Sequence, residues 1–397
     1  MTAASSLAAL TADADAALAD AVPGIVAAVT DRDGNFYEGA AGVRRIGEPA
    51  PMTRDTVFCI FSCTKAVTGV AMLQLLEAGR IALDDPAAKY VPGIARLQVL
   101  TGFDAAGRPQ TRPPVRDITI RHLLLHTSGL GFDFTHPDLL RAHEALNIPG
   151  TGTGRRIALD SVLLFDPGDG WQYGLSLEWA GLVLEAVAGK SLGDVMQERI
   201  FAPLGMADTG YRLTPSMRAR RASLHQRGSG GTLEATDFET PQDPEVQMGG
   251  SALYSTVPDY MRFIRMVLND GAGEHGRVLK PETVALAARN GLPAGMLAEM
   301  PRSAVPARSN DFDFFPAIPK TWGMSFMVNE RDLPTGRPAG SLGWAGLANL
   351  YYWIDRRNGI GGMWAAQVLP FVDVVAAPAA VAFETAVYRH LPSRGLV

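Results

Sequence analysis

The chain has 397 residues, of which 47% are hydrophobic and 19% are charged. This length and composition are typical of one large or two medium globular domains with a substantial core, and they exclude a disordered protein. The formal net charge of −5 is mild and no block of like charge occurs, which argues against a nucleic-acid-binding surface.

The N-terminal segment has the pattern of an amphipathic helix, because Leu7, Leu10, Ala14 and Leu18 recur at helical spacing. It has neither the basic region nor the continuous apolar region of a secretory signal. No apolar run in the sequence reaches the length of a transmembrane span. For a chain that is not a trimmed mature form, we therefore expect a cytoplasmic location and no membrane partner.

Two strands are expected next, over residues 24–31 and 35–45, with Gly34 in the turn between them. A helix is expected from Ser62 to Gly79, because apolar residues follow at helical spacing and a glycine ends the pattern. The only cysteines, Cys59 and Cys63, flank Ser62. Two cysteines do not make a disulfide framework, so we expect two reduced and buried thiols that serve packing.

The middle of the chain carries most of the helical patterns. Asp84-Asp85-Pro86 has the acidic cap and first-turn proline that open a helix. Thr119 is expected to cap a helix that runs through residues 122–126 and stops near Gly129. Residues 225–245 are polar and irregular, which indicates a loop.

The C-terminal part returns to strands, over residues 322–329, 339–346, 348–355 and 361–369, before a final helix over about 373–391. Strands at both ends and helices in the middle predict an α+β fold. One sheet, built from both termini, is flanked by helices and carries a mostly helical insert.

The domain boundaries follow from this division. We expect a discontinuous α/β sheet domain over residues 1–84 and 241–397. A mostly helical domain covers residues 85–240, and the active site lies at the interface of the two domains.

Ser62 and Lys65 are the first candidate functional residues. Residues three apart share one face of a helix, so both side chains point the same way at its first turn. The free N–H groups and partial positive charge of a helix N-terminus favour an oxyanion near the serine. A lysine partly removed from water can accept the serine proton, as in Ser-Lys nucleophilic catalysis. The alternative for this tetrapeptide alone is a helix-capping serine beside a solvated lysine.

Two further segments support catalysis. Tyr173 follows a Pro-Gly-Asp-Gly turn and precedes a helix that begins near Leu177, a junction from which a side chain can project into a cleft. Gly343-Trp344-Ala345-Gly346 lies in a predicted strand, and two glycines in a strand indicate close backbone approach by a ligand.

The chain resembles the serine β-lactamase/penicillin-binding-protein-like superfamily and, within it, the family VIII carboxylesterases. The resemblance implies a β-lactamase/transpeptidase-like fold with an antiparallel sheet. The stretches that carry it lie in family order at residues 58–92, 118–130, 165–189, 202–211 and 249–271.

The resemblance also implies roles for individual residues. Ser62 is the acylated nucleophile, and Lys65 and Tyr173 share the proton transfers, with the resting base left open between them. The segment from Gly343 to Gly346 falls where the β-lactamases have a Lys-Thr-Gly strand, so Trp344, Ala345 and Gly346 are expected to bind substrate. The backbone N–H groups of Ser62 and Leu347 form the oxyanion hole.

Two positions depart from the β-lactamase pattern. Leu175 stands where these enzymes have the asparagine of a Tyr-x-Asn motif, and Trp344 replaces the lysine that binds a β-lactam carboxylate. Both changes favour a neutral and more apolar ligand, so Leu175 is a further substrate-binding candidate. They argue against strong β-lactamase activity.

Other candidates have structural explanations. His122 and His126 have the i, i+4 spacing of a metal pair, but no third ligand is evident. Ser341 is one residue away from a nucleophile elbow, yet it lies outside a strand-to-helix corner and is expected to be structural. The aromatic stretch at residues 311–315 is expected either to form an acyl-pocket wall or to fill the core.

We therefore expect a serine esterase that hydrolyses small to medium carboxylic esters through an acyl-enzyme on Ser62. No cofactor or metal is expected, and the expected partner is a small-molecule ester. An acyltransferase with the same acyl-enzyme and an amide or β-lactam hydrolase are the alternatives. The combination of Ser62, Lys65 and Tyr173 argues against a non-catalytic binding protein on the same fold.

Overall fold

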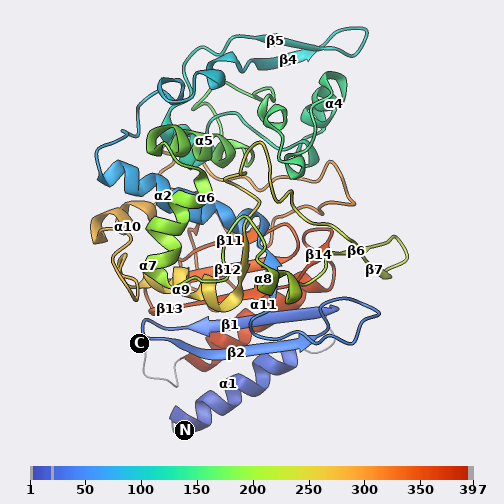
Figure 1. The fold of residues 1–397 in the computed structure, drawn as a ribbon, viewed down its shortest axis with the longest axis vertical. Coiled ribbons are helices and arrows are strands. Elements are labelled where there is room, and N and C mark those ends of the chain that lie inside the picture. Colours follow the sequence, from blue (N-terminus) through green and yellow to red (C-terminus); the bar gives the residue numbers. More distant parts are fainter. Residues whose placement is uncertain (1–2, 19–21, 392–397) are drawn as a thin grey trace.

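A seven-stranded antiparallel sheet organises the computed structural model, which describes residues 3–18 and 22–391 (Figure 1). Its strand order within these ranges is β2-β1-β13-β12-β11-β10-β9. The strands are β1 (Gly24–Thr30), β2 (Asn35–Gly42), β9 (Lys320–Trp322), β10 (Met327–Asn329), β11 (Leu342–Gly346), β12 (Leu350–Asp355) and β13 (Ile360–Ala365). The predicted α+β fold with a sheet built from both ends of the chain is thus confirmed.

Both faces of this sheet are covered, which explains why β1 is apolar at nearly every position. Ile25 and Val29 pack with α1 (Ala3–Leu18) and α11 (Ala376–His390) on one face. Val26 belongs to the core on the other face, where α9 (Val257–Leu268) lies against the sheet. Because side chains alternate along a strand, a strand buried on both faces has no polar side.

The predicted amphipathic helix at the N-terminus is confirmed as α1. Leu10, Ala14 and Leu18 are buried against the sheet and α11. The side chain of Leu7, the fourth member of the predicted stripe, lies outside those described.

Helices also separate the sheet from the part of the molecule that contains the hairpin of β4 (Val99–Phe103) and β5 (Pro109–Arg112) (Figure 1). The predicted helix after Ser62 is α2 (Thr64–Glu77), and the one near Leu177 is α5 (Ser176–Ala188). Thr119 caps α3 (Ile120–Leu125) through a capping box with His122, as its position predicted. The others are α4 (Pro137–Leu146), α6 (Leu192–Met196), α7 (Ala202–Leu204), α8 (Pro215–Ala219) and α10 (Pro281–Ala287).

In the part of the chain that the structure describes, three small sheets lie outside the main one. They pair β3 (Val57–Cys59) with β8 (Tyr254–Thr256), β4 (Val99–Phe103) with β5 (Pro109–Arg112), and β6 (His225–Arg227) with β7 (Leu233–Ala235) and β14 (Val368–Leu369). The segment 225–245 is therefore not wholly irregular. These strands are short, so single-sequence patterns identify them poorly.

The prediction that a helix begins at Asp84-Asp85-Pro86 is wrong. The chain forms only a 3-10 turn at Ala87–Lys89. The Asp85 carboxylate accepts from the Ala82 N–H at 2.8 Å and from the Tyr90 hydroxyl at 2.5 Å. The acidic residue thus closes a turn, because its oxygens meet partners outside a helix.

Two of the expected C-terminal strands are each divided. Residues 322–329 contain a reversal in which Ser325 has a positive φ of 79°, so β9 and β10 are separate antiparallel partners. Residues 361–369 divide into β13 and β14, and β14 leaves the main sheet to pair in parallel with β6. Apolar runs do not reveal such reversals, because the residues stay buried on both sides of the turn.

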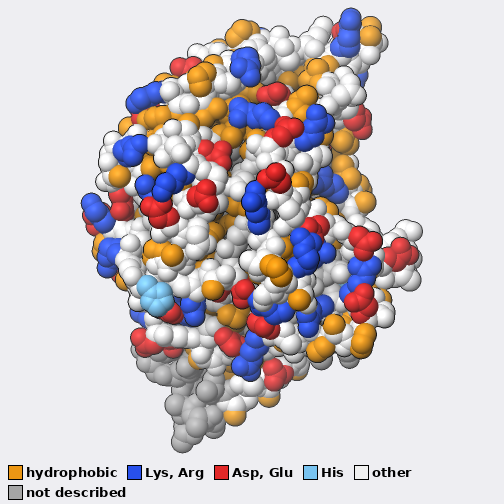
Figure 2. Space-filling model, in the orientation of Figure 1, with side chains coloured by type: hydrophobic (Ala, Val, Ile, Leu, Met, Phe, Trp, Pro, Cys, Tyr) orange, Lys and Arg blue, Asp and Glu red, His pale blue; other side chains and the backbone are white. Residues whose placement is uncertain are grey.

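The face in Figure 2 has basic and acidic side chains interspersed. Among the described helices, none combines the length and apolar character needed to cross a membrane. The division into domains at residues 84/85 and 240/241 stays a prediction.

Candidate active site

A strained turn presents Ser62. The residue lies in a 3-10 turn (Phe61–Cys63) directly before α2, so the positive end of that helix adjoins it. Phe61 has a positive φ of 42°, which is unfavourable for a side chain with a Cβ. The turn is held because the Ile60 N–H donates to the Leu253 carbonyl at 2.9 Å and the Phe61 ring stacks on Phe238. The predicted placement of Ser62 at a helix start is confirmed.

Lys65 points back to the serine from the first turn of α2. Its side chain is buried, with 1% exposure, and Nζ donates to Ser62 Oγ at 3.2 Å and to the Gly250 carbonyl at 2.8 Å. Nζ also lies 5.1 Å and 4.8 Å from the ring centroids of Phe132 and Tyr173. The solvated lysine of the alternative interpretation is therefore wrong.

Glu178 is the residue near this pair that the sequence analysis missed. It is buried on α5, accepts from the Gly250 N–H at 2.5 Å and accepts from Ser251 Oγ at 3.3 Å. Burial raises the pKa of Glu178, while the nearby Lys65 charge opposes that rise. Gly250 thus links the two charged side chains through its carbonyl and its N–H. The available signal was a single acid in the apolar run LSLEWAGLVL.

Tyr173 lies beside this cluster on the loop before α5. Its side chain is only 3% exposed, and its hydroxyl oxygen accepts from Trp344 Nε1 at 3.0 Å. The loop packs tightly, because a Cβ on Gly174 would lie 2.4 Å from the Leu130 carbonyl oxygen. The structure therefore brings Tyr173, which is distant in the sequence, to the neighbouring pair Ser62 and Lys65.

His126 packs edge-on within this aromatic environment rather than beside His122. The Nδ1 of His126 accepts from the Gly174 N–H at 3.4 Å, and its ring lies 5.0 Å from that of Tyr173. Burial lowers the pKa of His126 well below its ordinary value, and the Lys65 charge lowers it further. The Nδ1 of His122 instead accepts from the Thr119 N–H. The two rings thus have separate structural partners.

Strand β11 brings its C-terminal end against the turn Phe61–Cys63. A Cβ on Gly346 would lie 2.5 Å from the Ile60 carbonyl oxygen, so only glycine allows this approach. Ser62, Tyr173, Trp344, Ala345 and Leu347 line one small cavity together with Phe312. This location assigns Phe312, within the aromatic stretch 311–315, to the wall of the site.

Gly346 and Leu175, two of the predicted substrate-binding residues, are not among the described residues that line the cavities at Ser62. Leu175 is buried at the start of α5, where its carbonyl accepts from Glu178 N–H. Ser341, whose hydroxyl donates to the Pro338 carbonyl at 2.8 Å, is buried outside the site.

A larger cavity of about 240 Å³ also opens at Ser62. Its walls are mainly apolar and include Phe134, Phe238, Met248 and Leu347, while Arg308 is its one charged lining residue among those described. The Cys63 thiol faces the core instead, and burial raises its pKa. A serine, a buried lysine and a tyrosine thus lie close together, and the serine lines an apolar cavity.

Comparison with known proteins is consistent with this site. The family model described as Beta-lactamase matches residues 9–386. ML-236A carboxylate methylbutanoyltransferase of Penicillium citrinum is 32% identical over 99% of this chain and 98% of its own length. Lovastatin esterase of Penicillium rubens is 32% identical over 93% of this chain and 94% of its own. A mutant of simvastatin synthase from Aspergillus terreus superposes with a TM-score of 0.85 and 31% identity, covering 96% of this chain and 94% of that structure. The chain belongs to the beta-lactamase family, in a group of relatives that includes acyltransferases and an esterase.

Proposed function

We propose that this protein is a serine esterase of the family VIII type, which cleaves small to medium carboxylic esters through an acyl-enzyme. The observation that carries the proposal is the contact of 3.2 Å between Lys65 Nζ and Ser62 Oγ at the base of an apolar cavity. A buried lysine in hydrogen-bond reach of a serine is the geometry of an activated nucleophile. The expected cytoplasmic location is part of the same proposal.

The reaction follows from the residues around Ser62. The ester carbonyl oxygen lies between the backbone N–H groups of Ser62 and Leu347, and Ser62 Oγ attacks the carbonyl carbon. Lys65 and Tyr173 take up the serine proton and return a proton to the departing alcohol. Water then attacks the acyl-enzyme, takes the acyl group as a carboxylic acid and restores the Ser62 hydroxyl.

The walls of the site favour a neutral ester. Trp344 offers a neutral N–H, which Tyr173 already accepts, where the β-lactamases have a lysine. Apolar side chains dominate the cavity, so an acyl chain gains more from burial there than a charged group does. Trp344 and Ala345 contact the ligand directly in this proposal. Gly346 and Leu175 support it by keeping β11 and α5 in place.

Acyl transfer is the second candidate, because relatives similar over nearly the whole chain are named as acyltransferases. The acyl-enzyme is the same, and only the second nucleophile differs: an alcohol or amine replaces water. Product analysis with p-nitrophenyl butyrate and a competing alcohol separates the two candidates. Predominant free butyrate supports the esterase, and predominant transfer to the alcohol supports the acyltransferase.

The central test is Ser62→Ala with p-nitrophenyl butyrate as substrate. We expect at least about a thousandfold loss of kcat, because the nucleophile is removed. Ser341→Ala is the matched control, since this buried serine lies outside the site. Labelling by a fluorophosphonate should mark the parent at Ser62 and spare Ser62→Ala. Near-parental turnover by Ser62→Ala would remove Ser62 from the mechanism, and a parent that neither turns over esters nor takes the label would favour a binding protein.

A further inference from the structure

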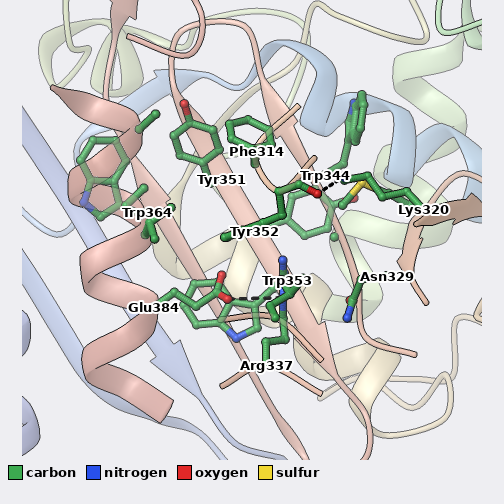
Figure 3. A pocket seen from close by; sticks show the side chains of 17 residues that line it. Phe314, Lys320, Asn329, Arg337, Trp344, Tyr351, Tyr352, Trp353, Trp364 and Glu384 are labelled. Carbon is green, nitrogen blue, oxygen red and sulfur yellow. Dashed lines mark hydrogen bonds and ion pairs between the residues drawn. The ribbon is translucent and has the colours of Figure 1, made fainter. Parts of the chain in front are cut away.

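A second cavity lies behind the active site, between the sheet and α11 (Figure 3). Its volume is about 70 Å³. Seven of the 17 residues that line it are aromatic, and those labelled in Figure 3 include Phe314, Tyr351, Trp353 and Trp364. A space of this size exceeds what one water molecule needs, so it has room for a small organic molecule.

Arg337 is the polar group that gives this cavity a chemical preference. Its side chain projects among the aromatic residues in Figure 3, although the residue is only 6% exposed. Its Nε forms an ion pair with Glu384 Oε1 at 3.4 Å, a contact that does not have the geometry of a hydrogen bond (Figure 3). Among the described residues, neither terminal nitrogen of Arg337 has a hydrogen-bond partner. A buried guanidinium with this many unused donors is unfavourable unless a ligand or water supplies acceptors.

The other charged groups of the cavity are already engaged. Lys320 Nζ donates to Asp313 Oδ1 at 2.6 Å and to two backbone carbonyls. Glu384 Oε1 accepts a short hydrogen bond from the Thr335 hydroxyl. The free hydrogen-bonding capacity of a cation therefore belongs to Arg337 rather than to Lys320.

We propose that this cavity is a binding site for a small organic carboxylate, separate from the ester site. The two terminal nitrogens of Arg337 form a planar fork that matches the two oxygens of a carboxylate. The aromatic wall then contacts the apolar body of the acid. The volume of the cavity favours a short acid such as butyrate.

Trp344 connects this site to the proposed catalytic residues. Trp344 is one of the residues that line the second cavity, and its Nε1 donates to the Tyr173 hydroxyl at 3.0 Å. Gly343, the residue before Trp344, lies close to Arg337, because a Cβ on Gly343 would lie 3.2 Å from a terminal nitrogen of Arg337. A carboxylate bound to Arg337 thus contacts the strand that carries Trp344.

Binding is tested in Ser62→Ala, so that the result does not depend on turnover. Butyrate is titrated by calorimetry and by tryptophan fluorescence, because Trp344, Trp353 and Trp364 border the cavity. Butyramide, the neutral isostere, is the ligand control. We expect saturable binding of butyrate and at least about tenfold weaker binding of butyramide, since only the acid can pair with the guanidinium.

Variants around the second cavity test whether butyrate binds between the sheet and α11. Arg337→Gln should weaken butyrate binding at least about tenfold. Ala380→Leu should block it by filling the cavity from α11 while leaving Arg337 in place. Ala382→Leu, on the exposed side of the same helix, should bind like the parent. If Arg337→Gln fails to fold, butyrate binding to Ala380→Leu decides whether the acid occupies this cavity.

Three results would overturn the proposal. They are equal binding of butyrate and butyramide, unchanged butyrate binding in Ala380→Leu, and loss of binding when Ser62 of the parent is blocked by a fluorophosphonate. The last result would place the acid in the ester site instead. Because binding is measured without catalysis, a failed esterase assay leaves this test intact.

Discussion

The indole Nε1 of Trp344 donates a hydrogen bond of 3.0 Å to the hydroxyl oxygen of Tyr173. The two residues lie 171 positions apart in the sequence, and their rings are in contact at a centroid distance of 4.7 Å. Because the hydroxyl oxygen accepts from Trp344, the proton of Tyr173 remains free to point elsewhere. The tryptophan therefore orients the tyrosine in the proposed mechanism.

Trp344→Phe should lower kcat for p-nitrophenyl butyrate by about tenfold with a smaller effect on KM, because the ring stays while the N–H is lost. Trp322→Phe is the matched control, since Trp322 packs against Trp344 but its buried Nε1 has no hydrogen-bond partner. Steady-state kinetics of both variants provide the measurement. Equal losses in the two would show that packing, rather than the hydrogen bond, matters.

Gly346→Ala should reduce both stability and activity. The added Cβ would lie 2.5 Å from the Ile60 carbonyl oxygen, which forces β11 away from the turn that carries Ser62. We expect a loss of about 1–3 kcal/mol in the free energy of unfolding. A displacement of that kind should also lower kcat by about a hundredfold. Gly34→Ala, where a Cβ meets no atom within 4 Å, should leave kcat unchanged, and comparable losses in the two variants would contradict the close approach.

His126 should make folding sensitive to acid. Its pKa in the folded protein lies well below the ordinary 6.5, so it stays neutral where the unfolded chain takes up a proton. Its contribution to the free energy of unfolding is fully present above pH 6.5. Below that pH the contribution falls by about 1.4 kcal/mol per pH unit. Urea unfolding of the parent and His126→Gln should therefore show a difference that shrinks on acidification.

His275→Gln, at an exposed histidine, controls for the removal of one histidine from the chain. Parallel pH dependences in the parent and His126→Gln would show that folding does not lower the pKa of His126.

Cys59 and Cys63 should be unreactive in the folded protein. Both are buried, and burial raises the pKa of Cys59 to about 12 and that of Cys63 higher still. At about pH 8 a thiol reagent such as Ellman's reagent should label neither residue before unfolding and both in concentrated guanidinium chloride. Rapid labelling of the native protein at either position would contradict the buried packing around the turn that carries Ser62.

The sequence by itself determined what depends on local spacing. The amphipathic N-terminal helix, the strands β1 and β2, and the position of Ser62 and Lys65 at the start of a helix all follow from short-range periodicity. Tyr173 was also recognised from sequence, through its place in a family motif. The strand reversal at Ser325 was not predicted, because buried residues continue through it.

The tertiary structure alone decided which distant groups meet. The burial of Lys65, its link to Glu178 through Gly250, and the contact of Trp344 with Tyr173 depend on hydrogen bonds between residues 72 to 185 positions apart. The cavity in which Arg337 faces α11 is likewise formed by separate elements of the chain. Periodicity reports only which side of an element is apolar, whereas desolvation and pairing of charges depend on what the other elements bring to the same place.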